Sequence, residues 1–215
     1  MFKRVLCVKK TTKYERLKAT GLLQSSYVEN VLMKTWQEAA NIHITVADHI
    51  IQAFKDSGRQ VQVARDYQLV DKDFEDKDLI VSLGGDGTFL KTASMVKSRV
   101  LPIVGINTDP TRSVGHLTSI KIPYEYRNKD IPQLMDYIQR ENFKYVYKQR
   151  IMLEKKDALT EKSIKKTFAL NEVFVAERNV GASSIYRLKA DGQYVGKFKS
   201  SGFLMCTGTG STGWL

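Results

Sequence analysis

One segment constrains the fold of this chain more than any other: an apolar run that meets a glycine-rich turn. Residues 79–83, Leu-Ile-Val-Ser-Leu, form a short apolar run of the kind that fills a buried strand. Residues 84–88, Gly-Gly-Asp-Gly-Thr, follow at once. Three glycines in four positions allow backbone dihedrals that are closed to other residues and let a ligand approach the main chain. The segment therefore predicts a buried strand that ends in a tight turn carrying one carboxylate.

This turn is also predicted to open a helix. Residues 89–96 carry apolar side chains at helical spacing, and Thr88 is a suitable N-cap. Because the first N–H groups of a helix attract anions, the turn indicates a phosphate site. An ionised Asp86 only accepts hydrogen bonds and would repel phosphate, so we expect it to hold a hydroxyl or a metal beside one. In the alternative interpretation, which the turn alone leaves open, Asp86 merely caps the helix.

The N-terminal part of the chain alternates strands with helices, which is typical of an α/β domain with a Rossmann-like parallel sheet. Strands are predicted at 4–8, 60–64, 79–83 and 101–107, and helical segments end near residue 40 and span 44–54, 89–96 and 132–138. The carboxyl ends of parallel strands meet at one edge of a sheet, where ligands bind. We therefore expect Asn107 and the loop at 108–117 to lie beside the glycine turn.

From about residue 141 the apolar period changes to the alternation of β-strands. Strands are predicted at 143–147, 151–154, 168–175, 184–189 and 194–199, and the Asp191-Gly192 pair between the last two predicts a hairpin turn. We place the domain boundary here, with an α/β domain over 1–141 and a mostly β domain over 142–215.

The final stretch contains Gly-x-Gly-x-x-Gly at 208–213. A dinucleotide-binding fingerprint needs a following helix, a second strand and an acidic residue about 20 positions on, so we reject that interpretation. The glycine and hydroxyl residues can still offer N–H and O–H donors to phosphate or ribose oxygens. Because an apolar run at 203–206 precedes them and Trp214 follows, we predict a packed loop.

Charge narrows the range of partners. Lys and Arg outnumber Asp and Glu by 34 to 23, a net charge of +11, which suits nucleic acid, anionic membranes or phosphorylated small molecules. The charges are scattered rather than gathered into tracts, so we expect small phosphorylated ligands and no nucleic acid. No apolar run approaches the roughly 20 residues that span a bilayer, and no transmembrane segment is expected.

The N-terminus and the cysteines bear on location. The first strand begins almost at once, so we expect that any targeting segment was removed or never present. Cys7 and Cys206 each lie in an apolar, strand-like run, which predicts two buried thiols in a reducing compartment. His43 and His49 lack metal-ligand spacing and fall in a helical segment, where we expect polar or core roles.

Three motifs follow one another along the chain: Gly-Gly-Asp-Gly-Thr at 84–88, Asn171-Glu172, and Thr-Gly-Thr-Gly-Ser-Thr at 207–212. Together they resemble the NAD kinase family, whereas the first alone is shared with diacylglycerol and sphingosine kinases. Further segments resemble the mitochondrial branch of that family in particular; they lie at 10–15, 105–110, 113–117 and 200–202. The resemblance covers nearly the whole chain.

The resemblance implies an α/β domain followed by a β-sandwich, with a site at the domain junction. It implies transfer of a phosphoryl group from ATP, or another donor, to the 2′-hydroxyl of the adenosine ribose of NAD, giving NADP. Asp86 would be the base that orients and deprotonates this hydroxyl. Mg²⁺ would accompany ATP, and no residue is implied as a resident metal ligand. The implied binding residues are Gly84, Gly85, Gly87 and Thr88 at phosphates, Asn171 and Glu172 at the adenosine half of NAD, and Thr207, Thr209, Gly210, Ser211 and Thr212 around the same pocket. Asn107 is a further candidate binding residue because of its position in the loop at the strand end.

The resemblance also implies a homodimer or higher homo-oligomer, and a mitochondrial location, with the cytoplasm as the alternative. The chain has Ser201 where most of the family has an acidic residue and Gly208 where most has proline, and the mitochondrial branch shares both departures. Family members continue beyond the position of Leu215, so we expect a partial sandwich. Two other functions stay open: a truncated, non-catalytic nucleotide-binding or structural subunit of a larger, possibly mitochondrial, assembly, and a lipid kinase of the diacylglycerol or sphingosine type.

Overall fold

The computed structural model describes residues 2–24, 30–179 and 181–213. The chain divides into two compact units, Met1–Val146 and Tyr147–Leu215, and each is described by itself. This division lies five residues after the boundary predicted at 141/142. The compact units are not by themselves independently folding domains, so the domain boundary at 141/142 stays a prediction.

The first unit is built on a five-stranded parallel sheet in the order β2-β1-β3-β4-β5. The strands are β1 (Arg4–Lys9), β2 (Gln60–Arg65), β3 (Leu79–Leu83), β4 (Ile103–Asn107) and β5 (Ile120–Lys121). The register pairs Lys9 with Leu83 and Leu83 with Ile106, so the carboxyl ends of β1, β3 and β4 meet at one edge. The predicted α/β domain with a parallel sheet is confirmed.

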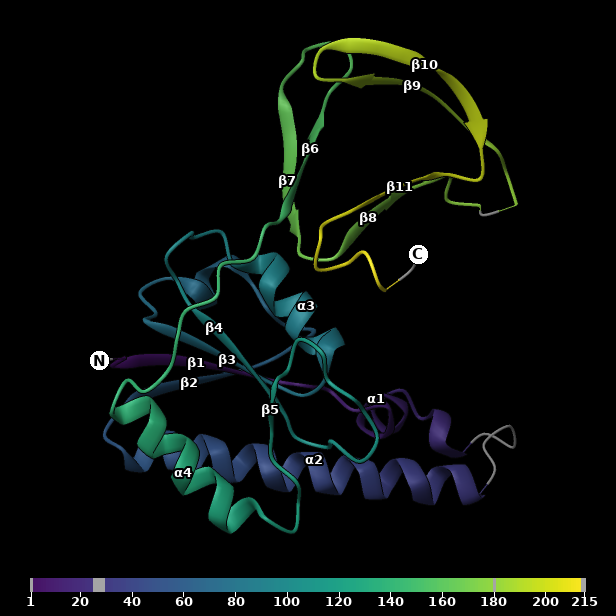
Figure 1. Cartoon of the computed structure of the whole chain (residues 1–215). Coiled ribbons are helices and arrows are strands. Elements are labelled where there is room, and N and C mark those ends of the chain that lie inside the picture. Colours follow the sequence, from purple (N-terminus) through teal and green to yellow (C-terminus); the bar gives the residue numbers. More distant parts are fainter. Residues whose placement is uncertain (1, 25–29, 180, 214–215) are drawn as a thin grey trace. The chain divides into compact units, whose positions relative to one another are not determined.

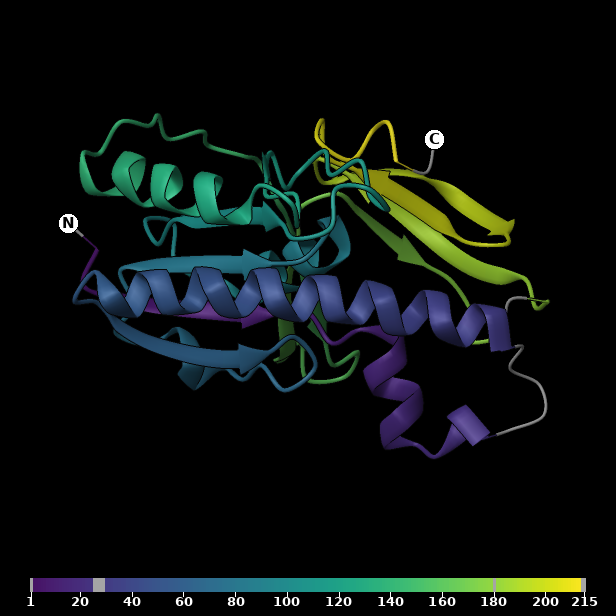
Figure 2. The same ribbon diagram turned by 90° about the horizontal axis from the view of Figure 1, so that it is seen from below.

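Helices cover both faces of this sheet (Figure 1). Two of them, α2 (Asn30–Asp56) and α4 (Arg127–Gln139), lie on one face, and α3 (Asp86–Met95) lies on the other. Figure 2 shows α2 running lengthwise along the strands. The remaining helical elements are α1 (Lys13–Ala19) and the short 3₁₀ helices η1 (Leu22–Gln24) and η2 (Asp71–Phe74).

Strand alternation divides the apolar core into two clusters. Val5 and Cys7 point to the face covered by α2 and α4, whereas Leu6 and Val8 point to the opposite face. The first cluster adds residues of β3 and of the two helices: Leu79, Val81, Leu83, Val46, Ile50, Phe54, Leu134 and Ile138. Because both faces are covered, β3 is buried along its whole length and β1 from Val5 to Lys9, as strands without polar alternation require.

The predicted pair of helical segments around residues 40–44 is wrong, because α2 is one helix of 27 residues. No glycine or proline interrupts it, and the buried positions Ala40, His43 and Ala47 keep helical spacing across the predicted break. The part of the prediction that falls on residues 25–29 lies outside the described residues.

The predicted start of the helix after the glycine turn is also wrong. Helix α3 begins at Asp86, and Gly85 is its N-cap. The backbone N–H groups of Thr88 and Phe89 donate to the carbonyl oxygen of Gly85 at 3.0 and 3.2 Å. Thr88 is therefore the third helical residue rather than the cap, and its side chain is buried.

A third difference concerns residues 143–147, which form no strand among the described residues. Instead Phe143 stacks on Phe2 with ring centroids 6.0 Å apart and meets Tyr145 edge-on at 5.5 Å. Two of the alternating aromatic residues that predicted a strand, Phe143 and Tyr145, thus make ring contacts instead of strand pairing. Helix α4 begins five residues before Pro132, where the shorter predicted helix was to start.

The second unit contains three antiparallel two-stranded ribbons, which confirms the predicted mostly β part. They pair β6 (Ile151–Lys156) with β7 (Ser163–Ala169), β8 (Glu172–Val175) with β11 (Phe203–Cys206), and β9 (Ser184–Ala190) with β10 (Gln193–Ser200). Asp191 and Gly192 have φ of 49° and 80° and form the predicted hairpin turn. The predicted strand at 168–175 is divided between β7 and β8 by Leu170 and Asn171.

The second unit buries little apolar surface of its own. Leu170 is the one buried apolar side chain that we find among its described residues. Many others are exposed, including Met152, Ile164, Phe174, Ile185, Tyr194 and Phe198. The two cysteines follow the same division: Cys7 is buried, but Cys206 is only half-buried, so the prediction of two buried thiols is half wrong.

Candidate active site

The glycine turn packs tightly at Gly84. Its φ of +154° lies in the region that favours glycine, and its N–H donates to the carbonyl oxygen of Ile106 at 3.0 Å. A Cβ at this position would lie 2.7 Å from Thr88 Oγ1 and 3.0 Å from Lys10 Cβ. Gly84 is therefore needed to bring the ends of β1, β3 and β4 together. Its N–H group is used in the hydrogen bond to β4.

The turn opens toward solvent at Gly87. A Cβ on Gly85 would lie 3.2 Å from Ser113 Oγ, whereas a Cβ on Gly87 would meet nothing within 4 Å. Asp86 and Gly87 occupy the first two positions of α3, where backbone N–H groups have no carbonyl partner within a helix. These N–H groups are the ones placed to receive an anion.

The carboxylate of Asp86 is bound by the loop that follows β4. Its Oδ2 accepts a hydrogen bond from the N–H of His116 at 2.8 Å. Its Oδ1 accepts from the N–H of Leu117, the N–H of Thr118 and the hydroxyl of Thr118, each at 3.0 Å. All four donors belong to the loop and none to α3, so these contacts do not support the alternative in which Asp86 only caps its helix.

These contacts also set the charge of Asp86. Partial burial acts to raise the pKa of the carboxyl, but the hydrogen bonds from Thr118, His116 and Leu117 lower it, and the net result lies below the ordinary value. Asp86 is therefore an anion at neutral pH. The structure brings it beside the loop after β4, as predicted.

Asn107 shapes that loop. Its side chain is 1% exposed, its Nδ2 donates to the carbonyl oxygen of Ser113 at 2.9 Å, and its Oδ1 accepts from the N–H of Asp109 at 3.1 Å. Gly115, with φ of +68°, packs so closely that a Cβ there would lie 2.7 Å from Asn107 Nδ2. The nucleotide contact predicted for Asn107 stays a prediction, and both polar atoms of its side chain bond within the loop.

His43 joins this loop to α2, a role that sequence reasoning missed. Its Nδ1 lies 2.7 Å from Thr108 Oγ1 and its Nε2 lies 3.1 Å from the carbonyl oxygen of Lys10. Burial lowers the pKa of His43 to about 4, so the ring is neutral at physiological pH. The available signal was the place of His43 on the buried stripe of α2.

In the second unit, the structure brings the other two motifs together. The N–H of Thr207 donates to the carbonyl oxygen of Asn171 at 2.8 Å, and its hydroxyl donates to that of Leu170 at 2.6 Å. Gly210 lies against the main chain of Asn171 so closely that a Cβ there would overlap its backbone atoms. The glycine- and hydroxyl-rich loop is therefore packed, as predicted. Thr209 is half-buried in it, and Ser211 and Thr212 are exposed.

Two oxygens in this region have no hydrogen-bond partner. They are Asn171 Oδ1 and Glu172 Oε2, which are buried and unpaired within the described part of the chain. Both atoms are acceptors, and a buried acceptor without a donor costs about 1–3 kcal/mol. A ligand that supplies hydroxyl or amino donors would satisfy them.

The comparison with protein families decides the family. Residues 10–143 match the model described as the ATP-NAD kinase N-terminal domain. This match covers more than half of the chain and includes the glycine turn, Asp86 and the loop that binds it. The chain belongs to the NAD kinase family.

Individual members of the NAD kinase family resemble the chain over most of its length. The rat protein named NAD kinase 2, mitochondrial, is 30% identical, with 98% of this chain and 59% of the relative covered. The NAD kinase of Fusobacterium nucleatum is 31% identical, with 76% of this chain and 56% of the relative covered. The chain thus spans about three fifths of the length of these relatives.

Solved NAD kinase structures confirm the fold. An NAD kinase from Archaeoglobus fulgidus, in complex with ATP, matches with a TM-score of 0.56 and 23% identity, covering 98% of this chain and 63% of that one. Yeast NADH kinase, complexed with NADH, matches with a TM-score of 0.59 and 20% identity, covering 100% of this chain and 60% of that one. The predicted resemblance to the family is confirmed.

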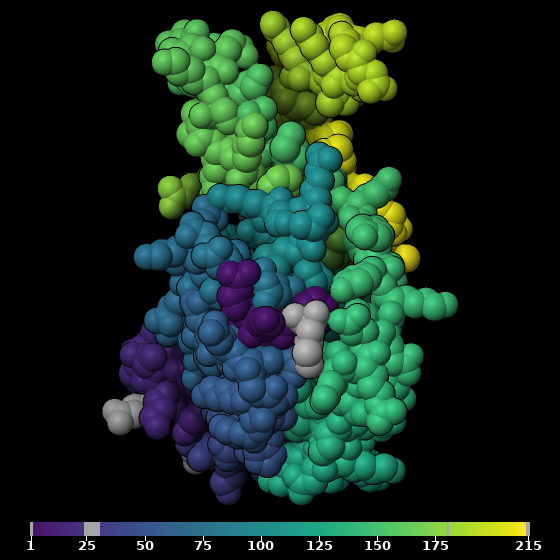
Figure 3. Space-filling model, turned by 90° about the vertical axis from the view of Figure 1, so that its left-hand side faces the viewer, coloured from purple at the N-terminus to yellow at the C-terminus, as the bar shows by residue number. Residues whose placement is uncertain are grey.

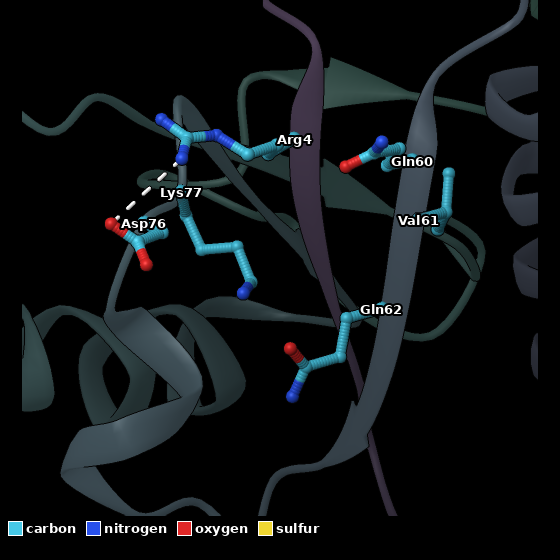
Figure 4. A pocket seen from close by; sticks show the side chains of 6 residues that line it. All are labelled: Arg4, Gln60, Val61, Gln62, Asp76 and Lys77. Carbon is cyan, nitrogen blue, oxygen red and sulfur yellow. Dashed lines mark ion pairs between the residues drawn. The ribbon is translucent and has the colours of Figure 1, made fainter.

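In this member of the NAD kinase family, two cavities lie at the edge of the sheet opposite the glycine turn, near the amino ends of β1 and β2. Figure 3 shows that edge, with the start of the chain in purple between blue and green segments. One cavity of about 260 Å³ is lined by Arg4, Gln60, Val61, Gln62, Asp76 and Lys77, and Arg4 points to Asp76 across 3.8 Å (Figure 4). The other, of about 640 Å³, shares Arg4 and Gln60. Ligands of open parallel sheets bind at the carboxyl ends, so neither cavity is the candidate site.

Two kinds of feature are absent from the described residues. Within them, no group of three or more His, Cys, Asp and Glu side chains is arranged to hold a metal ion. Within the same residues, no helix combines the length and the apolar character that crossing a bilayer requires.

Proposed function

We propose that this chain is an NAD kinase, which transfers the terminal phosphoryl group of ATP to the 2′-hydroxyl of the adenosine ribose of NAD. The observation that carries the proposal is the ionised carboxylate of Asp86, held by four hydrogen bonds beside an open glycine turn at the head of α3. Membership of the NAD kinase family supports the choice of reaction.

In this proposal the glycine turn binds phosphate. The N–H groups of Asp86 and Gly87 point out of the first turn of α3, and nothing lies within 4 Å of where a Gly87 side chain would begin. A phosphate can therefore approach the main chain here and gain both hydrogen bonds and the favourable field of the helix dipole. Gly84, Gly85 and Thr88 shape this surface through their packing.

Asp86 orients the hydroxyl and takes its proton. A carboxylate whose pKa lies below the ordinary value for Asp is too weak a base to remove a proton from an alcohol in the ground state. Proton transfer therefore accompanies formation of the new oxygen–phosphorus bond, when the hydroxyl becomes acidic. The main contributions of the protein are positioning and neutralisation of charge, as in phosphoryl transfer generally.

The second unit supplies contacts to the adenosine half of NAD. The buried acceptors of Asn171 and Glu172 bind hydroxyl and amino donors of the dinucleotide, which relieves the cost of leaving them unpaired. Thr207 and Gly210 hold the loop against Asn171. Thr209, Ser211 and Thr212 offer hydroxyl groups from the same loop.

Several finer properties belong to this proposal. ATP enters as its Mg²⁺ complex, because the metal offsets repulsion between the phosphates and the carboxylate of Asp86. The relatives named mitochondrial NAD kinase 2 support a mitochondrial location for this chain. We also propose a homodimer or higher homo-oligomer, in which exposed apolar side chains of the second unit are covered.

Incubation with NAD, ATP and Mg²⁺, followed by chromatographic detection of NADP, tests the activity. The Asp86→Asn variant is the control for a contaminating kinase, and light scattering gives the oligomeric state. NADP formation that Asp86→Asn abolishes supports the proposal. Phosphorylation of diacylglycerol or a sphingoid base without any of NAD would replace it with a lipid kinase, and nucleotide binding without transfer would favour a non-catalytic subunit.

A further inference from the structure

We infer that the two oxygens of the Asp86 carboxylate have different tasks: Thr118 and its neighbours hold Oδ1, and Oδ2 receives the proton of the substrate hydroxyl. This inference rests on the proposed phosphoryl transfer. It makes Thr118 a positioning residue, because its hydroxyl touches the carboxylate at 3.0 Å and acts on the substrate only through Asp86.

The count of hydrogen bonds separates the two oxygens. Each oxygen of a carboxylate offers about two lone-pair directions. Oδ1 accepts three hydrogen bonds, two of them from Thr118, so its capacity is filled. Oδ2 accepts one, from the N–H of His116 at 2.8 Å, and keeps room for a second donor. A ribose hydroxyl that approaches Asp86 therefore finds its acceptor at Oδ2.

The loop is built to hold this arrangement. Thr118 is 0% exposed, and a Cβ on Gly115 would lie 2.6 Å from its Oγ1. Asn107 bonds across the same loop to Ser113 and Asp109, as described above. His43 fixes the neighbouring Thr108 from α2. The donors to Oδ1 are thus fixed before any substrate binds, which spares the reaction the cost of orienting Asp86.

Two bonds change at phosphorus in the proposed step, and one proton moves. The 2′-oxygen of the ribose forms a bond to the terminal phosphorus of a nucleoside triphosphate. The bond from that phosphorus to the bridging oxygen breaks, and its electron pair leaves with the nucleoside diphosphate. The proton of the hydroxyl passes to Oδ2 of Asp86, while Oδ1 keeps its three hydrogen bonds.

Two variants of Thr118 test the inference in the whole chain. Thr118→Val keeps the shape and removes the hydroxyl, and Thr118→Ser keeps the hydroxyl. The control is Thr92→Val on α3, since Thr92 is also 0% exposed but its hydroxyl donates to the carbonyl oxygen of Thr88. NADP formation gives kcat and both KM values, and thermal unfolding gives the stability of each variant.

We expect Thr118→Val to lower kcat about tenfold or more with both KM values within twofold of the original, because substrate binding is kept and Asp86 is held less firmly. Thr118→Ser should restore kcat to within threefold, and Thr92→Val should leave it unchanged. If Oδ1 were the reacting oxygen, removal of the Thr118 hydroxyl would free it, and an unchanged or raised kcat would overturn the inference. An equal loss in Thr118→Val and Thr92→Val, or in both Thr118 variants, would also overturn it. Absence of NADP formation by the original chain would instead reject the proposed function.

Discussion

The two polar clusters of this chain differ in how they satisfy their own atoms. Around Asp86 the chain itself supplies donors to both carboxylate oxygens: four donors reach the carboxylate, and both polar atoms of Asn107 are paired. Around Asn171 and Glu172 the main chain is paired, but two buried acceptor oxygens are not. The space around the glycines differs in the opposite sense. Gly87, beside Asp86, faces open space, whereas Gly210 packs against the backbone of Asn171.

In the proposed function, this contrast matches two different tasks: Asp86 takes part in the reaction, and Asn171 and Glu172 recognise the substrate. A reacting carboxylate gains from being fixed before the substrate arrives, since reorientation during the reaction adds to the barrier. A recognition group gains from being unpaired, because the ligand then relieves a cost that the free protein bears. Substitutions that change one feature of either cluster should therefore affect activity, binding and stability to different degrees.

The largest effect is expected from Asp86→Asn. The amide cannot take a proton, so NADP formation should fall by about 10²–10⁴-fold. Its NH₂ group would also face backbone donors of the loop, and the free energy of unfolding should fall by about 1–3 kcal/mol. Enzyme assays and urea unfolding measure the two effects. Asp109→Asn, in the same loop, is the control for a general loosening, and near-normal turnover in Asp86→Asn would remove Asp86 from the mechanism.

Alanine at Gly87 and at Gly210 should have opposite consequences. At Gly87 the methyl group meets no neighbour, and alanine in a helix stabilises by up to about 1 kcal/mol, so the protein stays folded while phosphate is kept from the backbone. We expect an activity loss on the order of 100-fold, about 2.7 kcal/mol, without a lower melting temperature.

At Gly210 the methyl group overlaps the backbone of Asn171, so the loop must move. Stability should fall by about 1–3 kcal/mol, with faster hydrogen exchange in the second unit. A stable, unperturbed Gly210→Ala protein would contradict the packed loop, and an active Gly87→Ala protein would contradict phosphate binding at the turn.

Glu172→Gln should affect binding more than stability. Glu172 Oε2 has no partner to lose, so the free energy of unfolding should change by less than about 0.5 kcal/mol. Loss of the charged acceptor should raise the KM for NAD roughly tenfold, equivalent to about 1.4 kcal/mol, and leave the KM for ATP unchanged. The exposed Glu177→Gln is the control. Equal effects on both KM values would argue against recognition of NAD by Glu172.

The last effect appears only on acidification and concerns the dependence of the first cluster on His43. Its pKa is about 4 in the folded chain and about 6.5 when unfolded, so the unfolded chain binds a proton more readily as the pH falls through this window. Stability is therefore complete above about pH 6.5 and is lost toward pH 4. Between pH 7.5 and 5 the loss should be roughly 2 kcal/mol, measured by urea unfolding.

His43→Gln should abolish this part of the pH dependence, since glutamine does not titrate. His49→Gln, an exposed histidine on the same helix, is the control and should keep it. If both variants retain the full pH dependence, other groups cause it, and the loop that holds Asp86 does not rely on a neutral His43.

Sequence reasoning predicted the features that depend on local chemistry. The run at 79–83 and the glycines after it predicted the buried strand, the turn and the site at the sheet edge. The pairing of Asn171 and Glu172 with the loop at 207–212 came from family resemblance, because no local pattern relates residues so far apart. The side chain of Thr118 and the backbone donors of residues 116–118 were not foreseen, since their use depends on the folded path of the loop. The continuity of α2 was missed because polar residues in its middle resembled a break.

The reactivity of the two thiols measures the opening of each unit separately. Burial raises the pKa of Cys7 to about 12, whereas Cys206 in the second unit is half-buried. Only the thiolate reacts with alkylating reagents. At neutral pH such a reagent therefore modifies Cys206 through small openings of its ribbon, but reaches Cys7 only when β1 separates from β2 and β3. The relative rates of labelling would compare how often each of the two units opens, in a single sample.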